Sequence, residues 1–114
     1  MIRITVPLVP PSVNHYAKHT RSGRHYVTSE AKSFKEAVAI FAGGQTLTAS
    51  RYSVSISVYL GKGQRGDIDN FLKCVLDGMV EARVIHSDSA VTRLTVEKFR
   101  DEKNPRTEIT VYPL

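Results

Sequence analysis

Three aspartates and one lysine between residues 67 and 88 carry the side chains best suited to chemistry. Asp67 and Asp69 lie two positions apart in the segment Gly66-Asp67-Ile68-Asp69-Asn70-Phe71-Leu72-Lys73, and Asp88 follows after an apolar stretch. Mg²⁺ prefers oxygen ligands and keeps several waters for a phosphodiester substrate. Three convergent carboxylates would therefore suit a magnesium site. Lys73 would then touch the scissile phosphate or stabilise charge in the transition state.

The convergence rests on local geometry. In an extended segment, residues i and i+2 face the same way, so Asp67 and Asp69 can reach one ion. The helix between Asp69 and Asp88 is about 20 Å long at 1.5 Å per residue. A connection returning alongside it would place Asp88 near the helix start.

Each of these charged residues also has an ordinary structural interpretation. Asp is among the best helix N-caps, which explains one of the pair but explains both less well, because Ile68 between them is expected to face the core. Lys73 lies at i+4 from Asp69, where an exposed ion pair contributes at most a few tenths of a kcal/mol. A turn aspartate such as Asp88 is commonly only a turn residue.

Other reactive residue types are less suited to a site. Cys74 lies on a predicted helix without an activating histidine, so a packed thiol is expected. The histidines have no metal-type spacing with cysteine, which makes zinc improbable; they are His15, His19, His25 and His86. Asp77 borders the apolar helix face and favours a structural role.

The periodicity predicts the elements that position these residues. Period-two alternation predicts strands at 2–8, 51–60, 91–99 and 107–112. A first helix begins at Thr28 or Ser29 and stops at Gly43-Gly44, with an apolar face formed by Ala31, Phe34, Lys35, Ala37, Val38, Ile40 and Phe41. A second helix starts at Ile68 and continues through Met79. The order β-α-β-α-β-β predicts a single α+β domain over residues 1–114, with helices packed on a mostly antiparallel sheet.

Composition narrows the class of protein. The 114 residues carry a net charge of +5, which makes nucleic acid a reasonable partner. No apolar run is long enough to cross a membrane, and a single cysteine fits a reducing compartment, so a cytoplasmic protein is expected. A polar, cationic loop is predicted up to about residue 28. The candidate DNA-binding residues are Asn14, Tyr16, Lys18, Arg21, Arg24, Lys62 and Arg65.

Taken together, these segments resemble the RusA family of Holliday-junction resolvases, found in bacteria and their prophages. The acidic segment with Leu76-Asp77-Gly78-Met79 is similar to the family's D-x-D-N-x-x-K motif and following helix. Further similar segments, in the family's order, are Pro10-Pro11-Ser12-Val13-Asn14-His15-Tyr16, His25-Tyr26-Val27-Thr28, Asp88-Ser89-Ala90-Val91 and Val96-Glu97-Lys98. Two departures are Gly66, where some relatives have a basic residue, and Ser87, where many have an additional acid.

The resemblance implies that Asp67, Asp69 and Asp88 bind Mg²⁺, for which Mn²⁺ can substitute, and that Lys73 is the active-site lysine. It also implies a homodimer that cuts two strands of a four-way DNA junction symmetrically, which suits two sites related by a two-fold axis. The resulting hypothesis is a Mg²⁺-dependent, structure-selective endodeoxyribonuclease of recombination and repair. The alternatives are a junction-binding module without catalysis and a general metal-dependent nuclease.

Overall fold

A four-stranded sheet forms the centre of the molecule. In this computed structural model, which describes residues 1–12, 17–19 and 25–114 (of 17–19 and 25–27 the backbone only), the sheet order is β1-β6-β4-β5. Its strands are β1 (Ile2–Val6), β4 (Tyr52–Leu60), β5 (Val91–Arg100) and β6 (Arg106–Pro113). β6 pairs antiparallel with β1 and β4, whereas β4 and β5 run parallel. The predicted α+β class with a mostly antiparallel sheet is confirmed.

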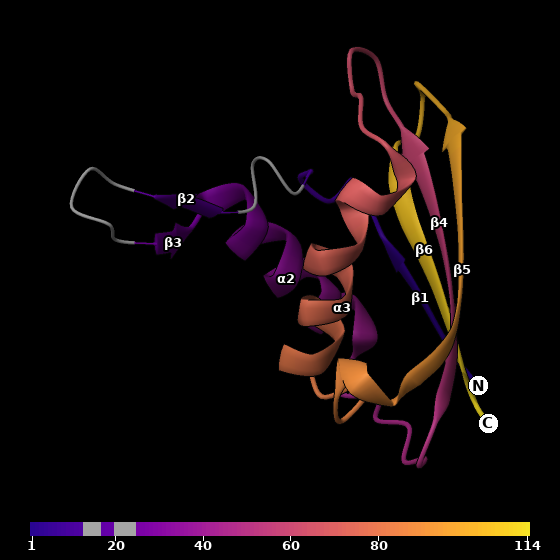
Figure 1. Ribbon diagram of the computed structural model, residues 1–114. Coiled ribbons are helices and arrows are strands. Elements are labelled where there is room, and N and C mark those ends of the chain that lie inside the picture. The colour runs from indigo at the N-terminus through magenta and orange to yellow at the C-terminus, as the bar shows by residue number, and fades with distance from the viewer. Residues whose placement is uncertain (13–16, 20–24) are drawn as a thin grey trace.

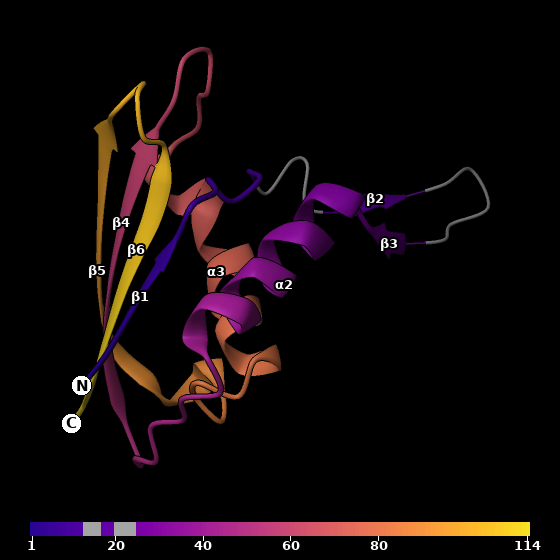
Figure 2. The ribbon, with the colours of Figure 1, turned by 180° about the vertical axis from the view of Figure 1, so that it is seen from behind.

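Two helices cover one face of this sheet. They are α2 (Ser29–Ala42) and α3 (Leu72–Glu81), and Figures 1 and 2 show both on the same side of the strands. Short 3₁₀ turns η1 (Ile68–Phe71) and η2 (Asp88–Ala90) flank α3. Because parallel strands need a crossover connection, η1 and α3 carry the chain from the end of β4 back to the start of β5.

The core lies between the sheet and the helices. Alternate residues of β4 from Tyr52 to Leu60 are buried, and the serines between them face the other side, as the alternation predicts. The Thr28 hydroxyl accepts a hydrogen bond from Ala31 N at 3.4 Å and caps α2, and Gly43 ends the helix with a φ of 62°.

The predicted apolar face of α2 was wrong at its C-terminal end. The buried residues Ala31, Phe34, Val38 and Ala42 follow one helical stripe. Ile40 and Phe41 lie off this stripe and are 72% and 48% exposed. Helical periodicity places them on the solvent side although both are apolar.

The end of the first strand and the loop before α2 also differ from the prediction. β1 ends at Val6, directly before Pro7, since proline has no N–H to donate to the sheet ladder. The predicted loop before α2 contains an antiparallel pair of three-residue strands, β2 (Ala17–His19) and β3 (His25–Val27), too short for a periodicity signal. Figure 1 shows this pair beyond the start of α2, outside the main sheet. Within the part of the chain described, no helix is both long and apolar enough to span a membrane.

Candidate metal and phosphate-binding site

Asp67 and Asp69 lie where the chain leaves the loop after β4 and enters η1. Asp67 has extended backbone angles, φ −80° and ψ 155°, and occupies the N-cap position, yet its side chain makes no capping hydrogen bond. Both residues are exposed. The capping interpretation therefore does not account for the Asp67 carboxylate, which can bind a cation.

The local backbone differs from the extended segment that the prediction assumed. Residues 68–71 form a 3₁₀ turn, so the rule that i and i+2 share a face does not extend to Asp69. Ile68 is 42% exposed rather than packed in the core, and Phe71, one turn further along, is the buried residue at 1%. Ile68, the first residue of this turn, is therefore not part of the core.

Asp88 lies at the opposite end of the sheet from the other two acids. Tyr52 at the start of β4 pairs with Val91, and Leu60 at its end pairs with Arg100. Asp88 precedes Val91 at one end of the β4–β5 pair, and Asp67 follows Leu60 at the other end. The length of β4 between these two ends is about 26 Å at 3.3 Å per residue. Figure 1 shows the chain entering the helix layer at one end of β4 and turning into β5 at the other.

One chain alone therefore does not bring the three carboxylates together. Among the described residues, no group of three or more histidine, cysteine, aspartate or glutamate side chains is arranged to hold a metal ion. Asp88 instead lines a small cavity of about 190 Å³ with Asp77 and Glu81. Ser87 caps η2 by accepting a hydrogen bond from Ser89 N at 3.2 Å.

Lys73 lies in the first turn of α3, one turn beyond Asp69. Its Nζ is 3.3 Å from the Asp77 carboxylate at i+4, and the Lys73 side chain is 62% exposed. Lys73 thus forms an ion pair with Asp77, a partner that the spacing from Asp69 does not indicate. Such an exposed pair contributes only a few tenths of a kcal/mol.

Two cations of β5 contact the loop that leads to Asp67. Lys98 Nζ donates to Gly66 O at 3.0 Å, and the Arg100 guanidinium donates to Gly61 O at 2.8 Å and Gln64 O at 3.1 Å. A cavity of about 480 Å³ lies here, lined by Leu60, Arg65, Gly66, Asp67, Lys98, Phe99 and Arg100. Lys98 and Arg100 have no local sequence signal as site residues, because only the parallel β4–β5 pairing brings the ends of both strands to one edge.

The backbone of Gly66 lies close to the buried ring of Phe71. Its φ is +155°, and a Cβ at this position would lie 2.4 Å from Phe71 Cζ and 2.9 Å from Cε1. The buried ring of Phe71 thus fills the space that a side chain would need. A side chain at this position would therefore require the Phe71 ring to move.

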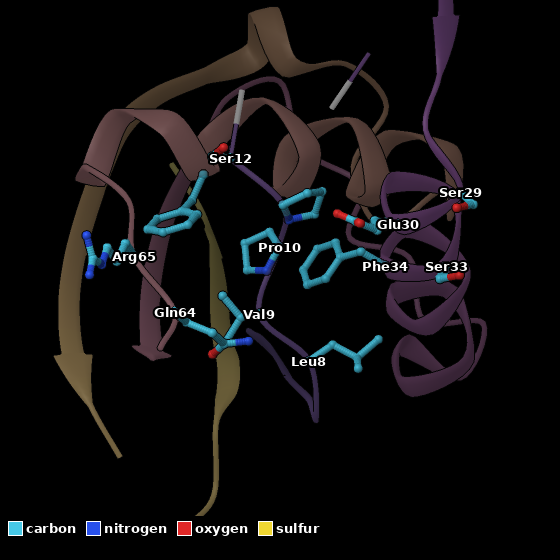
Figure 3. Close-up of a pocket in the computed structure, with 12 residues that line it drawn as sticks. Leu8, Val9, Pro10, Ser12, Ser29, Glu30, Ser33, Phe34, Gln64 and Arg65 are labelled. Atoms are coloured by element: carbon cyan, nitrogen blue, oxygen red, sulfur yellow. The ribbon is translucent and has the colours of Figure 1, made fainter. Parts of the chain in front are cut away.

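The remaining candidate residues fall into two groups. Lys62 is exposed in the loop after β4, and Arg65 lines both the cavity beside Asp67 and a second one of about 470 Å³. Figure 3 shows this second cavity between the Leu8–Ser12 segment, the start of α2 and the Gln64–Arg65 segment. The DNA-binding predictions for Asn14, Tyr16, Arg21, Arg24 and the Lys18 side chain lie outside the described residues.

Cys74 is a packed thiol, as predicted. It is 1% exposed, and its Sγ lies 3.9 Å from Ala31 O. Burial, partly offset by nearby Lys35, raises the pKa of this thiol to about 12. The thiolate needed for nucleophilic or metal chemistry is therefore disfavoured at neutral pH.

Comparison with known proteins identifies the family. The family model described as "Endodeoxyribonuclease RusA" matches residues 7–112. The chain is 31% identical over 111 residues to "Crossover junction endodeoxyribonuclease rusA" of Enterobacteria phage 82, covering 95% of this chain and 91% of the relative. The same identity and coverage hold for the RusA protein of Escherichia coli strain K12, and the Shigella sonnei protein is 29% identical. The chain belongs to the RusA family of endodeoxyribonucleases.

Proposed function

We propose that this protein is a Mg²⁺-dependent endodeoxyribonuclease that resolves four-way DNA junctions by paired symmetric cuts. The names of its relatives support action on crossover junctions. The observation that carries the proposal is the pair of exposed carboxylates, Asp67 and Asp69, beside a cationic cavity. Their oxygens suit a hard cation, and the neighbouring cations suit a phosphate backbone. The proposed place of action is the cytoplasm.

The separation of Asp88 from the other acids leads us to propose a site shared by two protomers. Within the described chain, β5 pairs only with β4, and eight of its ten residues are exposed. A long strand with an unpaired edge is a template for pairing with another chain. Leu94, on the side covered by the helices, is 39% exposed at this edge and would be buried there.

A two-fold axis at the middle of β5 would pair the two copies antiparallel. Val91 of one protomer then faces the partner's Arg100, because the strand runs from 91 to 100. Asp88, three residues before Val91, approaches the end of the partner's β5, where the partner's Asp67 and Asp69 lie. Each dimer gains two identical sites about 30 Å apart at 3.3 Å per residue.

The proposed site divides the chemistry among named residues. Mg²⁺, when bound by Asp67, Asp69 and the partner's Asp88, supplies a Lewis acid and an activated water for phosphodiester hydrolysis. Lys73, one helical turn from Asp69, neutralises negative charge that develops on the phosphate in the transition state. Two sites related by the axis cut two strands of a two-fold symmetric junction, one each.

Cleavage of labelled DNA tests this function. The protein is incubated with a synthetic four-way junction and with a linear duplex of matching sequence, with Mg²⁺, with Mn²⁺ or with EDTA. We expect metal-dependent cuts in the junction only. Asp69→Asn should abolish cutting while junction binding is kept or strengthened, because a negative charge next to DNA is removed.

Three results would contradict the proposal in different ways. A gel shift without cleavage under any metal condition would indicate a binding module without catalysis. Equal cutting of junction and duplex would indicate a general nuclease. Loss of binding together with cleavage in a folded Asp69→Asn protein would contradict the proposed role of this carboxylate.

A further inference from the structure

The cavity beside Asp67 is lined by more cations than carboxylates. Its charged lining residues are three cations, Arg65, Lys98 and Arg100, against the single carboxylate of Asp67. We propose that this cavity is a phosphate subsite. In it, Lys98 and Arg65 bind a phosphate of the DNA backbone that neighbours the phosphate being cut. The inference rests on the proposed function, and it assigns Lys98 and Arg100 roles that the sequence motif does not contain.

The hydrogen bonds of the two β5 cations leave donors for such a ligand. A lysine ammonium has three N–H donors and an arginine guanidinium has five. Within the described part of the chain, Lys98 uses one donor on Gly66 O, and Arg100 uses two on the 61–66 loop. Both residues are exposed in the single chain, and pairing of the β5 edge through its backbone would leave these side-chain donors accessible to a phosphate.

Ion pairing within the protein does not account for these charges. The ion pairs of the described residues involve Lys35, Lys73 and Arg106, and none includes a cation of this cavity. The three cations outnumber the single carboxylate of Asp67 and form no ion pair with it, so a bound phosphate would offset their mutual repulsion. The cavity of about 480 Å³ has ample space for a phosphate group.

The same hydrogen bonds tie the phosphate subsite to the metal ligand. Lys98 holds the carbonyl of Gly66, the residue directly before Asp67, and Arg100 holds two carbonyls earlier in the loop. We assign Arg100 as a positioning residue that fixes the loop, and Lys98 as a phosphate ligand that also braces Gly66. A DNA phosphate bound by Lys98 would therefore be held at a fixed position relative to Asp67.

Salt dependence of junction binding separates phosphate binding from a purely structural role. Binding is measured in EDTA at 50–200 mM salt for wild type, Lys98→Gln and Lys98→Arg. Each neutralised phosphate contributes about 0.9 to the slope of log K against log salt. We expect Lys98→Gln to lower the slope by about 0.9 for each phosphate that the variant no longer neutralises. The advantage of wild type then shrinks about 3.5-fold per phosphate over this fourfold salt range. Lys98→Arg should keep the slope.

Arg65→Gln is the second variant and Arg3→Gln is the matched control. Arg65 makes no hydrogen bond or ion pair with the described part of the chain, so its replacement leaves the loop intact and should lower the slope as Lys98→Gln does. Arg3 is exposed on β1, at the other edge of the sheet, and its replacement removes the same charge.

The outcomes separate this inference from the proposed function. A wild-type slope in both Lys98→Gln and Arg65→Gln, or an equal reduction in Arg3→Gln, would overturn the phosphate subsite. A wild-type protein that does not bind the junction at all would instead contradict the function on which the inference rests.

Discussion

Gly66→Ala tests how tightly the loop before Asp67 is packed. The new Cβ would lie 2.4 Å from Phe71 Cζ, about 1 Å inside the range where ordinary contacts begin, 3.4 Å. The ring is 1% exposed and cannot swing out without opening the core. Overpacking of this kind costs about 1–3 kcal/mol, and a backbone conformation nearly restricted to glycine adds about 1–3 kcal/mol for a residue with a side chain.

Gly63→Ala in the same loop provides the control. Gly63 has a φ of +76°, but no atom lies within 4 Å of the position that its Cβ would take, so only the backbone strain applies. We expect Gly66→Ala to lower the free energy of unfolding by about 1–3 kcal/mol more than Gly63→Ala does. Urea unfolding at one fixed protein concentration measures the difference, since dimerisation would make stability depend on concentration. Equal stability of the two variants would refute the packing argument.

Two further predictions concern the dimer edge and the buried thiol. Leu94→Lys should convert the proposed dimer to monomers in sedimentation and abolish junction cleavage, whereas Ile40→Lys on α2 should do neither. A Leu94→Lys dimer with full activity would contradict the proposed interface. Because burial raises the pKa of Cys74 to about 12, a thiol reagent should label it at pH 8 only after unfolding, and rapid labelling of native protein would contradict this. Because the thiol pKa is higher in the folded state, the protonated Cys74 side chain stabilises the fold fully below the unfolded thiol pKa. This stabilisation is lost as the pH rises towards 12.

Much of the fold follows from local patterns in the sequence. The alternation in β4 predicted which residues are buried, and Thr28 and Gly43 marked the ends of α2 because capping is a local interaction. Ile40 and Phe41 were assigned to the core because their apolar character outweighed their position on the helix. Composition alone does not fix which side of a helix faces the sheet.

The site was predicted less completely than the fold. The acidic residues were recognised by type and spacing, but their placement depends on β5 running parallel to β4, a long-range pairing without a local signal. This pairing separates Asp88 from Asp67 and brings Lys98 beside Gly66. The first turn after Asp67 is a 3₁₀ turn rather than extended chain, which exposes Ile68.

Mixing two inactive variants tests the shared metal site most directly. Asp69→Asn and Asp88→Asn proteins are each expected to be inactive, because every site of each homodimer lacks one ligand. If a site takes Asp69 from one protomer and Asp88 from its partner, a mixed dimer has one intact site and one site lacking both. Random exchange makes about half of the dimers mixed, so about a quarter of the sites become active.

The assay follows a labelled junction after the two variants are unfolded, mixed and refolded together. The shared-site account predicts restored Mg²⁺-dependent cleavage at about one quarter of the wild-type level, with single nicks rather than paired cuts. Refolding each variant alone is the control. A mixture as inactive as its parents, with mixed dimers demonstrated, would contradict the account.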